Sequence, residues 1–205
     1  MERSLQIWKG VFDPITMIPT INDSRFIEPA CTKLLPVKTI YSNEWFSVRN
    51  RGGFYTIEYN QPQVIIFPIV NNNSIVMVKV YRPIIADVTL ELPAGGAHEK
   101  ETPIRAAMRE FKEETGIIIN DESRFELVMP LIHSLRSPCF LFFYKVEISQ
   151  AEYEVRVRHD HEVAEVVCLT FSEIISMIKS GKIYLGLHVA IILRYLLNGQ
   201  RLELV

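Results

Sequence analysis

The chain has 205 residues, of which 48% are hydrophobic and 22% are charged. This length suits about one and a half domains, so we expect one full domain with a smaller appendage. The 22 lysines and arginines against 24 aspartates and glutamates give a formal net charge of −2. That balance argues against a nucleic-acid partner gripped by overall charge, since such domains are usually strongly basic. An anionic ligand would need a local arrangement of residues.

Cysteine usage and hydropathy indicate the compartment. The three cysteines, Cys31, Cys139 and Cys168, lie far apart and form no C-x-x-C pair. This pattern argues against a disulfide framework or a zinc site and fits a reducing cytoplasm. We expect no secretory signal, because the acidic N-terminal residues lead into no long apolar run. Residues 185–197 are too short to span a membrane, so we expect a cytoplasmic protein with no membrane partner.

The first half of the chain is predicted to be rich in strands. Residues 1–40 look irregular because prolines interrupt their short apolar pieces. Strands are predicted at 44–48 and 54–59, with Arg51-Gly52-Gly53 as a hairpin turn between them. The nearly continuous apolar runs at 64–70 and 75–81 are typical of paired central strands buried on both faces.

A helix is predicted next. Thr102 can cap it, Pro103 suits its first position, and Gly116 suits the residue beyond its end. Its expected apolar stripe is Ile104, Met108, Phe111 and Thr115.

The remaining elements complete a mixed fold. Further strands are predicted at 127–129, 140–148 and 164–169, a capping box at 170–173 opens a helix that stops at Gly181, and a last helix covers 185–197. The pattern predicts an α+β or α/β sandwich, with a β-rich appendage at 1–60 and the main domain at 61–205.

Three glutamates of the predicted 103–115 helix carry the chemical signal. Glu110, Glu113 and Glu114 stand at i, i+3 and i+4, so they share one side of the helix and repel one another. A hard divalent cation such as Mg²⁺ would turn that repulsion into binding. The glycines of the preceding 92–96 segment would let backbone carbonyls approach the same ion. This combination predicts a metal-assisted phosphate site, and a solvated acidic helix face is the alternative.

The spacing also resembles a known family. Gly95-x5-Glu101-x7-Arg109-Glu110-Phe111-x-Glu113-Glu114-x-Gly116-Ile117 resembles the Nudix box at every fixed position. The segments 78–83, 91–95 and 162–183 are similar to those of ADP-ribose pyrophosphatases and related sugar-nucleotide hydrolases. The resemblance implies a Nudix α/β/α sandwich around a mixed sheet. It also implies an N-terminal antiparallel β subdomain that often forms a homodimer and contributes to the nucleotide pocket.

The resemblance also implies a ligand set. Glu110 and Glu114 would bind Mg²⁺, with Mn²⁺ as a possible substitute, and Glu113 would serve as an additional or second-metal ligand. The carbonyl of Ala94 would be a further ligand. Arg109 would hold the glutamates in place through ion pairs.

Further residues are expected at the substrate. Glu162 matches the general base of the sugar-nucleotide group, although a loop glutamate is commonly only solvated. We expect Arg82, Glu91 and Gly95 to contact substrate, and a surface ion pair is the alternative for Arg82. The proline-containing loop of the ADP-ribose group has no clear counterpart near His133, which leaves the particular substrate open.

Other features favour simpler interpretations. His159-Asp160-His161 suggests a metal cluster but is expected to be a solvated loop, and His188 is expected to be a core histidine with a satisfied ring. The aromatic residues Trp45, Phe46, Phe54 and Tyr55 could stack on a base, but we expect most of them in the core or in a dimer contact.

The predicted function is therefore Mg²⁺-dependent hydrolysis of a nucleoside diphosphate sugar, foremost ADP-ribose to AMP and ribose 5-phosphate. Another Nudix substrate, such as a dinucleoside polyphosphate, is one alternative. A non-catalytic nucleotide sensor is the other, and the intact glutamate set argues against it.

Overall fold

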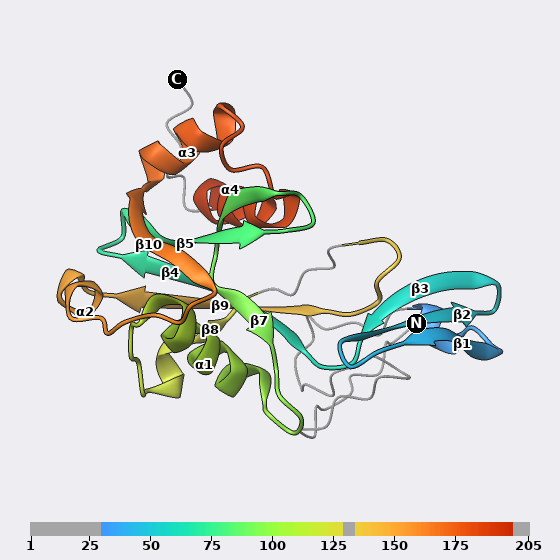
Figure 1. Ribbon diagram of the computed structural model, residues 1–205. Helices are drawn as coiled ribbons and strands as arrows, with labels where there is room; N and C mark the ends of the chain where they lie inside the picture. The colour runs from blue at the N-terminus through green and yellow to red at the C-terminus, as the bar shows by residue number, and fades with distance from the viewer. Residues whose placement is uncertain (1–29, 129–133, 199–205) are drawn as a thin grey trace. The chain divides into compact units, whose positions relative to one another are not determined.

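The computed structural model describes residues 30–128 and 134–198 (Figure 1). The chain forms two compact units. The first takes its described residues from Met1–Ile65, Ala94–Met108 and Phe125–Tyr144, and the second from Ile66–Pro93, Arg109–Arg124 and Lys145–Val205. Each unit is described separately below.

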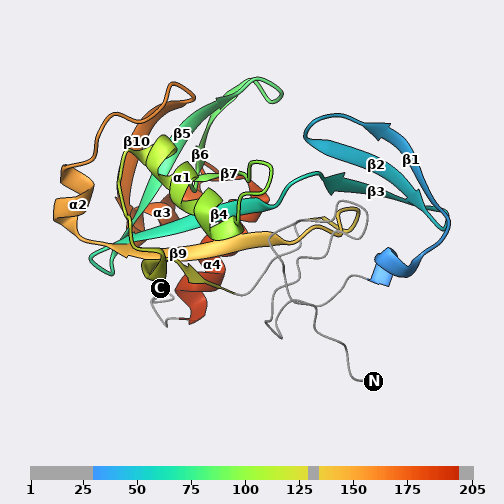
Figure 2. The same cartoon turned by 90° about the horizontal axis from the view of Figure 1, so that it is seen from below.

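The first unit contains a three-stranded antiparallel sheet that follows the short 3₁₀-helix η1 (Ala30–Lys33). Its strands are β1 (Val37–Ser42), β2 (Phe46–Arg51) and β3 (Phe54–Tyr59), in the order β1-β2-β3 (Figure 2). The hairpin predicted at the two glycines is confirmed, since Arg51 pairs with Phe54 across them. Gly52 and Gly53 have φ angles of 58° and 97°, which glycine adopts without strain.

The structure excludes a core position for three of the four aromatic residues beside this hairpin, and the alternative, a dimer contact, stays a prediction. Trp45, Phe54 and Tyr55 are 66%, 65% and 51% exposed. The polar residues that alternate with them are buried instead, and Arg51 and Glu58 are 1% and 0% exposed. Ion pairing allows this inversion, because buried charges are tolerated when each has a hydrogen-bonded partner.

A larger sheet has the strand order β10-β5-β4-β9-β8, with β6 paired to β5 and β7 paired to β4. Its strands are β4 (Gln63–Val70), β5 (Ser74–Arg82), β6 (Asp87–Glu91), β7 (Ala94–Gly96), β8 (Glu126–Leu127), β9 (Leu141–Ile148) and β10 (Val163–Thr170). The structure confirms the predicted pairing and burial of the two central strands, since β4 is buried after Gln63 and β5 is buried over most of its length. The predicted strand at 127–129 corresponds to β8, and its end at Met129 lies outside the described residues.

Helix α1 (Pro103–Thr115) has the predicted bounds. Thr102 accepts a hydrogen bond from the backbone N–H of Arg105 through Oγ1, at 3.3 Å. Its apolar stripe is only partly as predicted. Phe111 and Thr115 are fully buried and Ile104 and Met108 are half-buried, while the smaller Ala106 and Ala107 are fully buried.

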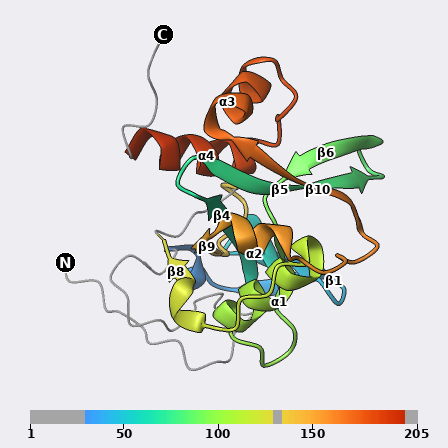
Figure 3. The same cartoon turned by 90° about the vertical axis from the view of Figure 1, so that its left-hand side faces the viewer.

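The second unit layers helices on strands. Helices α3 (Phe171–Lys179) and α4 (Gly186–Asn198) lie on one side of the strands β10, β5 and β6, and the C-terminal half of α1 lies on the other (Figure 3). Tyr195 of α4 fixes this packing, since its ring contacts Phe67 of β4 and Phe171 of α3 at centroid distances of 4.7 and 6.2 Å. The predicted mixed α+β fold is therefore confirmed.

Local signals explain some elements and miss others. The capping box at Thr170 and Glu173 is formed with both of its hydrogen bonds. The strands β6 and β7, the 3₁₀-helix η2 (Glu122–Arg124) and the short helix α2 (Gln150–Glu154) were not predicted. Neither were η1 and β1, most of which lie in the segment expected to be irregular. In the described ranges, no helix is both long and apolar enough to cross a membrane.

Candidate active site

Arg109 ties two of the helix glutamates together. Its Nη1 donates to Glu110 Oε1 at 2.8 Å and to Glu113 Oε2 at 2.9 Å. The side chain of Glu110 is 14% exposed and that of Glu113 is 45% exposed, so the first pair is the better shielded from water. Such an arginine offsets part of the repulsion between neighbouring carboxylates.

The loop before β10 is anchored on the C-terminal end of α1. The backbone N–H groups of Val157 and Asp160 donate to the carbonyls of Gly116 and Glu113, both at 2.8 Å. Gly116 has φ +73°, and a Cβ at this position would lie 1.9 Å from the Val157 carbonyl oxygen. Only glycine therefore allows the loop to approach the helix this closely.

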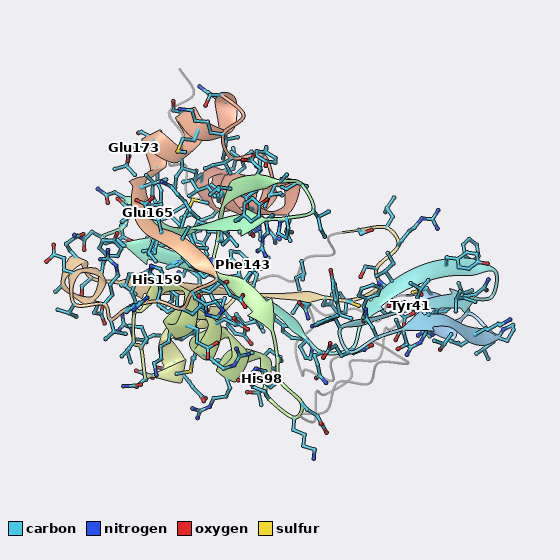
Figure 4. The ribbon with its side chains drawn as sticks, viewed as in Figure 1. Tyr41, His98, Phe143, His159, Glu165 and Glu173 are labelled. Atoms are coloured by element: carbon cyan, nitrogen blue, oxygen red, sulfur yellow. The ribbon has the colours of Figure 1, made fainter. Side chains whose placement is uncertain are left out.

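Asp160 shapes the end of the same loop. Its Oδ1 accepts from the backbone N–H groups of Glu162 and Val163 at 3.1 and 3.3 Å. The His159 ring is bonded to the Asp160 carbonyl at 2.7 Å, on the loop that leads into β10 (Figure 4). The Asp160 side chain thus stabilises the end of this loop. Glu162, directly before β10, is exposed.

Arg82, the last residue of β5, is paired with Glu91 of β6. Its Nε and Nη2 donate to the two carboxylate oxygens of Glu91 at 2.7 and 2.8 Å. Those hydrogen bonds, followed by the charges of Glu91, Glu114 and Glu162, raise the pKa of Arg82 above its usual value. The guanidinium, whose side chain is 48% exposed, therefore lies in the field of glutamates from β6, α1 and the β10 loop. The ion pair expected as the alternative for Arg82 is present, and its contact with a substrate stays a prediction.

Glu91 is a buried carboxylate committed to protein partners. Thr89 Oγ1 donates to its Oε1, and His188 Nε2 lies 3.5 Å from its Oε2. Burial alone would raise the pKa of Glu91, but the hydrogen bonds from Arg82 and Thr89 and the charge of Arg82 outweigh it and lower the pKa. Glu91 is thus ionised at neutral pH, and it can affect a substrate through Arg82.

The remaining box residues lie in the first unit. Ala94 and Gly95 belong to β7 and pair with Ile65 and Val64 of β4. In the loop that follows β7, marked by His98 in Figure 4, Glu101 Oε2 accepts from the His98 backbone N–H at 2.8 Å. Glu101 therefore closes the box loop. Metal coordination by the Ala94 carbonyl and substrate contact at Gly95 stay predictions.

The acidic side chains suit a divalent cation in their chemistry. Carboxylate oxygens are the ligands that Mg²⁺ prefers. As they stand, no three Asp, Glu, His or Cys side chains within 30–128 and 134–198 converge closely enough to hold an ion. Coordination by Glu110, Glu113 and Glu114 would therefore require side-chain rotation and stays a prediction.

Three contacts were not foreseen. The first is local, since Asp160 accepts from the backbone N–H of Glu162 two residues further on. The second joins His188 to Glu91, which are far apart in sequence. The third is a buried cluster on adjacent strands, in which Glu58 binds Arg49 and Arg51. Only the Glu58 cluster could have been inferred from the sequence, because its charged residues alternate with other residues along β2 and β3 with the period of a strand. His133 lies outside the described residues, so the loop around it stays untested.

Known proteins are similar over the box and its flanks. The NUDIX domain model matches residues 59–185. The methanol dehydrogenase activator of Bacillus methanolicus is 32% identical over 126 residues, which are 59% of this chain and 64% of that protein. The ADP-ribose pyrophosphatase of Bacillus subtilis (strain 168) is 27% identical over 126 residues, with the same two shares. The chain thus spans 64% of the length of these curated relatives.

A solved structure agrees with the fold. The crystal structure of an ADP compounds hydrolase has a TM-score of 0.57 at 19% identity, and the match covers 82% of this chain and 95% of that chain. That likeness shows the fold alone. Because the domain model covers more than half of the sequence, the chain belongs to the Nudix family.

Proposed function

We propose that the chain is a pyrophosphohydrolase that splits a nucleoside diphosphate sugar, foremost ADP-ribose into AMP and ribose 5-phosphate. The observation that carries the proposal is the position of Arg82, whose guanidinium is hydrogen-bonded to Glu91 and lies in the electrostatic field of Glu114 and Glu162. A cationic donor beside carboxylates from a helix and a loop is suited to a diphosphate and an attacking water. The pyrophosphatase of Bacillus subtilis supports the choice of ADP-ribose.

Nudix hydrolases generally use divalent metal cations. We propose Mg²⁺, with Mn²⁺ as a substitute, held by Glu110, Glu113, Glu114 and the Ala94 carbonyl. A divalent cation in such a site neutralises phosphate charge and lowers the pKa of a bound water.

The protein's own residues then have distinct roles. Arg82 binds a phosphate oxygen while Glu91 fixes its orientation. Glu162 removes a proton from the attacking water. The water oxygen forms a bond to phosphorus, and the bond from that phosphorus to the bridging oxygen breaks. Arg109 keeps the box glutamates in place.

The test is turnover of ADP-ribose, other nucleotide sugars, dinucleoside polyphosphates and nucleoside triphosphates with Mg²⁺ or Mn²⁺. Glu114→Gln and Glu162→Gln should each reduce kcat at least about 100-fold, as removal of a ligand or a general base does. Glu165→Gln is the matched control, because this β10 carboxylate is 57% exposed and forms an ion pair with Lys79. Silence on ADP-ribose with turnover of another nucleotide would change the substrate. Full activity of Glu114→Gln would refute the metal assignment.

A second candidate function is regulation of a partner enzyme without catalysis. It is favoured by one observation, the similarity to a relative named as a methanol dehydrogenase activator. Absence of turnover over the whole substrate panel, with nucleotide binding retained in calorimetry, would favour this candidate.

We also propose that the 1–60 appendage forms a homodimer through β1–β3. Tyr41 (labelled in Figure 4) and Ile57 lie in one cross-strand row, each paired with Val48 of β2, and they are 54% and 45% exposed. Ile57→Asp should convert the dimer to a monomer in sedimentation velocity. Ile118→Asp, at a 47% exposed position of the second unit, should leave the dimer unchanged. A dimer that survives Ile57→Asp would overturn this interface.

The proposed compartment is the cytoplasm. It is supported by the three free cysteines, which form no disulfide.

A further inference from the structure

The buried ring of His188 has a different partner at each of its two nitrogens. It lies near the start of α4 and is 7% exposed. Its Nδ1 accepts a hydrogen bond from the Leu92 backbone N–H at 3.0 Å. A backbone N–H can only donate, so Nδ1 must be the unprotonated nitrogen of the ring. In the neutral ring, the hydrogen is therefore on Nε2.

The protonated nitrogen faces the carboxylate that holds Arg82. Nε2 lies 3.5 Å from Glu91 Oε2, the oxygen that also accepts from Arg82 Nη2. Burial lowers the pKa of His188 and outweighs the opposing charge of Glu91, so the ring is neutral at pH 7. In this contact, the N–H group of a neutral ring faces the buried, ionised carboxylate of Glu91. At 3.5 Å the contact is electrostatically weak, but the ring also limits how far the Glu91 carboxylate can move.

Glu91 transmits this contact to the site. It uses both oxygens on Arg82 in a bidentate pair, the arrangement that best fixes the plane of a guanidinium. Neither bond uses Nη1 of Arg82. The same guanidinium lies in the electrostatic field of Glu114 and Glu162, so its plane determines in which direction Nη1 can donate to a ligand.

We propose that His188 is a positioning residue for the reaction, because it fixes Glu91 and thereby orients Arg82 toward the substrate diphosphate. The inference rests on the proposed function. It adds a residue of α4, outside the box, to the set that determines substrate affinity. Leu92 completes the arrangement by fixing which ring nitrogen faces Glu91.

Two substitutions separate positioning from simple packing. In His188→Asn, the amide oxygen can replace Nδ1 as the acceptor for Leu92, but the side chain is too short to reach Glu91. In His188→Gln, the amide nitrogen can replace Nε2 as the donor to Glu91. The contact with Leu92 is then lost.

The assay is steady-state hydrolysis of ADP-ribose at saturating Mg²⁺, with melting temperatures as a check on folding. His188→Asn should raise KM about tenfold with kcat nearly unchanged, because it weakens one hydrogen bond from Arg82 to a charged phosphate of the substrate. His188→Gln should recover most of that loss. Combined with Arg82→Met, His188→Asn should have no further effect on KM, since it acts through Arg82.

Equal KM values for the two His188 variants, or additive effects with Arg82→Met, would overturn the proposal. Calorimetric binding of inorganic pyrophosphate with Mg²⁺ gives a readout that does not need turnover. A wild-type protein that binds pyrophosphate but hydrolyses nothing would refute the proposed function alone, provided that His188→Asn still weakens binding and His188→Gln restores it. A wild-type protein that neither binds nor hydrolyses would overturn both.

Discussion

Gly116→Ala tests whether the close approach of the 157–162 loop to α1 supports both stability and activity. The substitution adds one methyl group at a residue whose φ is +73°. That methyl would lie 1.9 Å from the Val157 carbonyl oxygen, inside any real contact distance. The loop must therefore move.

The cost has two parts. An alanine held in the left-handed region costs about 1 kcal/mol. Displacing the loop also weakens two hydrogen bonds, from Val157 to Gly116 and from Asp160 to Glu113, at about 1 kcal/mol each. The total is about 3 kcal/mol. Gly181→Ala is the matched control, since its φ is +72° but nothing lies within 4 Å of the added methyl. It should cost only the strain, about 1 kcal/mol.

Urea unfolding and thermal melting measure the difference. Gly116→Ala should unfold with about 2 kcal/mol less stability than Gly181→Ala, or about 4–8 °C lower in Tm. Its kcat should also fall by about 100-fold, because Glu162 moves with the loop and a displacement of about 1 Å has that effect on catalysis. Equal losses of stability in the two variants would refute the steric argument. Unchanged kcat in Gly116→Ala would refute the link between this loop and the reaction.

Three further predictions concern buried and paired groups. Glu58→Gln should destabilise the protein by about 3–5 kcal/mol in urea unfolding, because Arg49 and Arg51 lose a buried counter-ion; a loss below about 1 kcal/mol would contradict this. Burial raises the pKa of Cys139 to about 11, so iodoacetamide should label it at least about tenfold more slowly than half-buried Cys168, and the difference should vanish in urea. Hydrogen bonds, first from Arg124, lower the pKa of Glu152 from 4.5 to about 2, so Glu152→Gln should cost about 1 kcal/mol at pH 7 after screening by solvent. That cost should persist above pH 4.5 and disappear as the pH falls from 4.5 toward 2, and a pH-independent difference would contradict the pairing.

Helix α1 shows what a sequence can specify by itself. Its start depends on Thr102 and Pro103 and its end on Gly116, and each of these signals acts within one turn of the helix. The spacing of the box glutamates is equally local. Their placement on one helix was therefore predictable.

Other features depend on partners distant in sequence. Strand β7 has three residues, two of them glycine, and is a strand only because it pairs with β4. His188 and Glu91, which are in contact, are almost a hundred residues apart in sequence. Glu162 and Arg82, whose charges influence each other, are eighty residues apart. Neither alternation nor periodicity reports such contacts, because both patterns describe single elements.

The β1–β3 sheet, which buries polar residues and exposes aromatic ones, shows a different limit of prediction from sequence. The aromatic residues Trp45, Phe46, Phe54 and Tyr55 were expected in the core or in a dimer contact, and large apolar side chains usually favour the core. Glu58 reverses this choice, since it accepts hydrogen bonds from Arg49, Arg51 and Thr56 within the sheet. A buried network that satisfies its own polar groups can occupy a core position without apolar residues.

Charge counting around Arg82 gives an independent argument for the cation. Arg82 lies in the electrostatic field of Glu91, Glu114 and Glu162, and Arg109 is paired with Glu110 and Glu113, so two arginines stand against five glutamates. The local charge is therefore negative, and a diphosphate would be repelled by a site that must bind it. Under the proposed function, a divalent cation would then serve binding as well as activation of water. Chelation should accordingly abolish the calorimetric binding of pyrophosphate, and tight binding in the presence of excess chelator would show that Arg82 suffices without a metal.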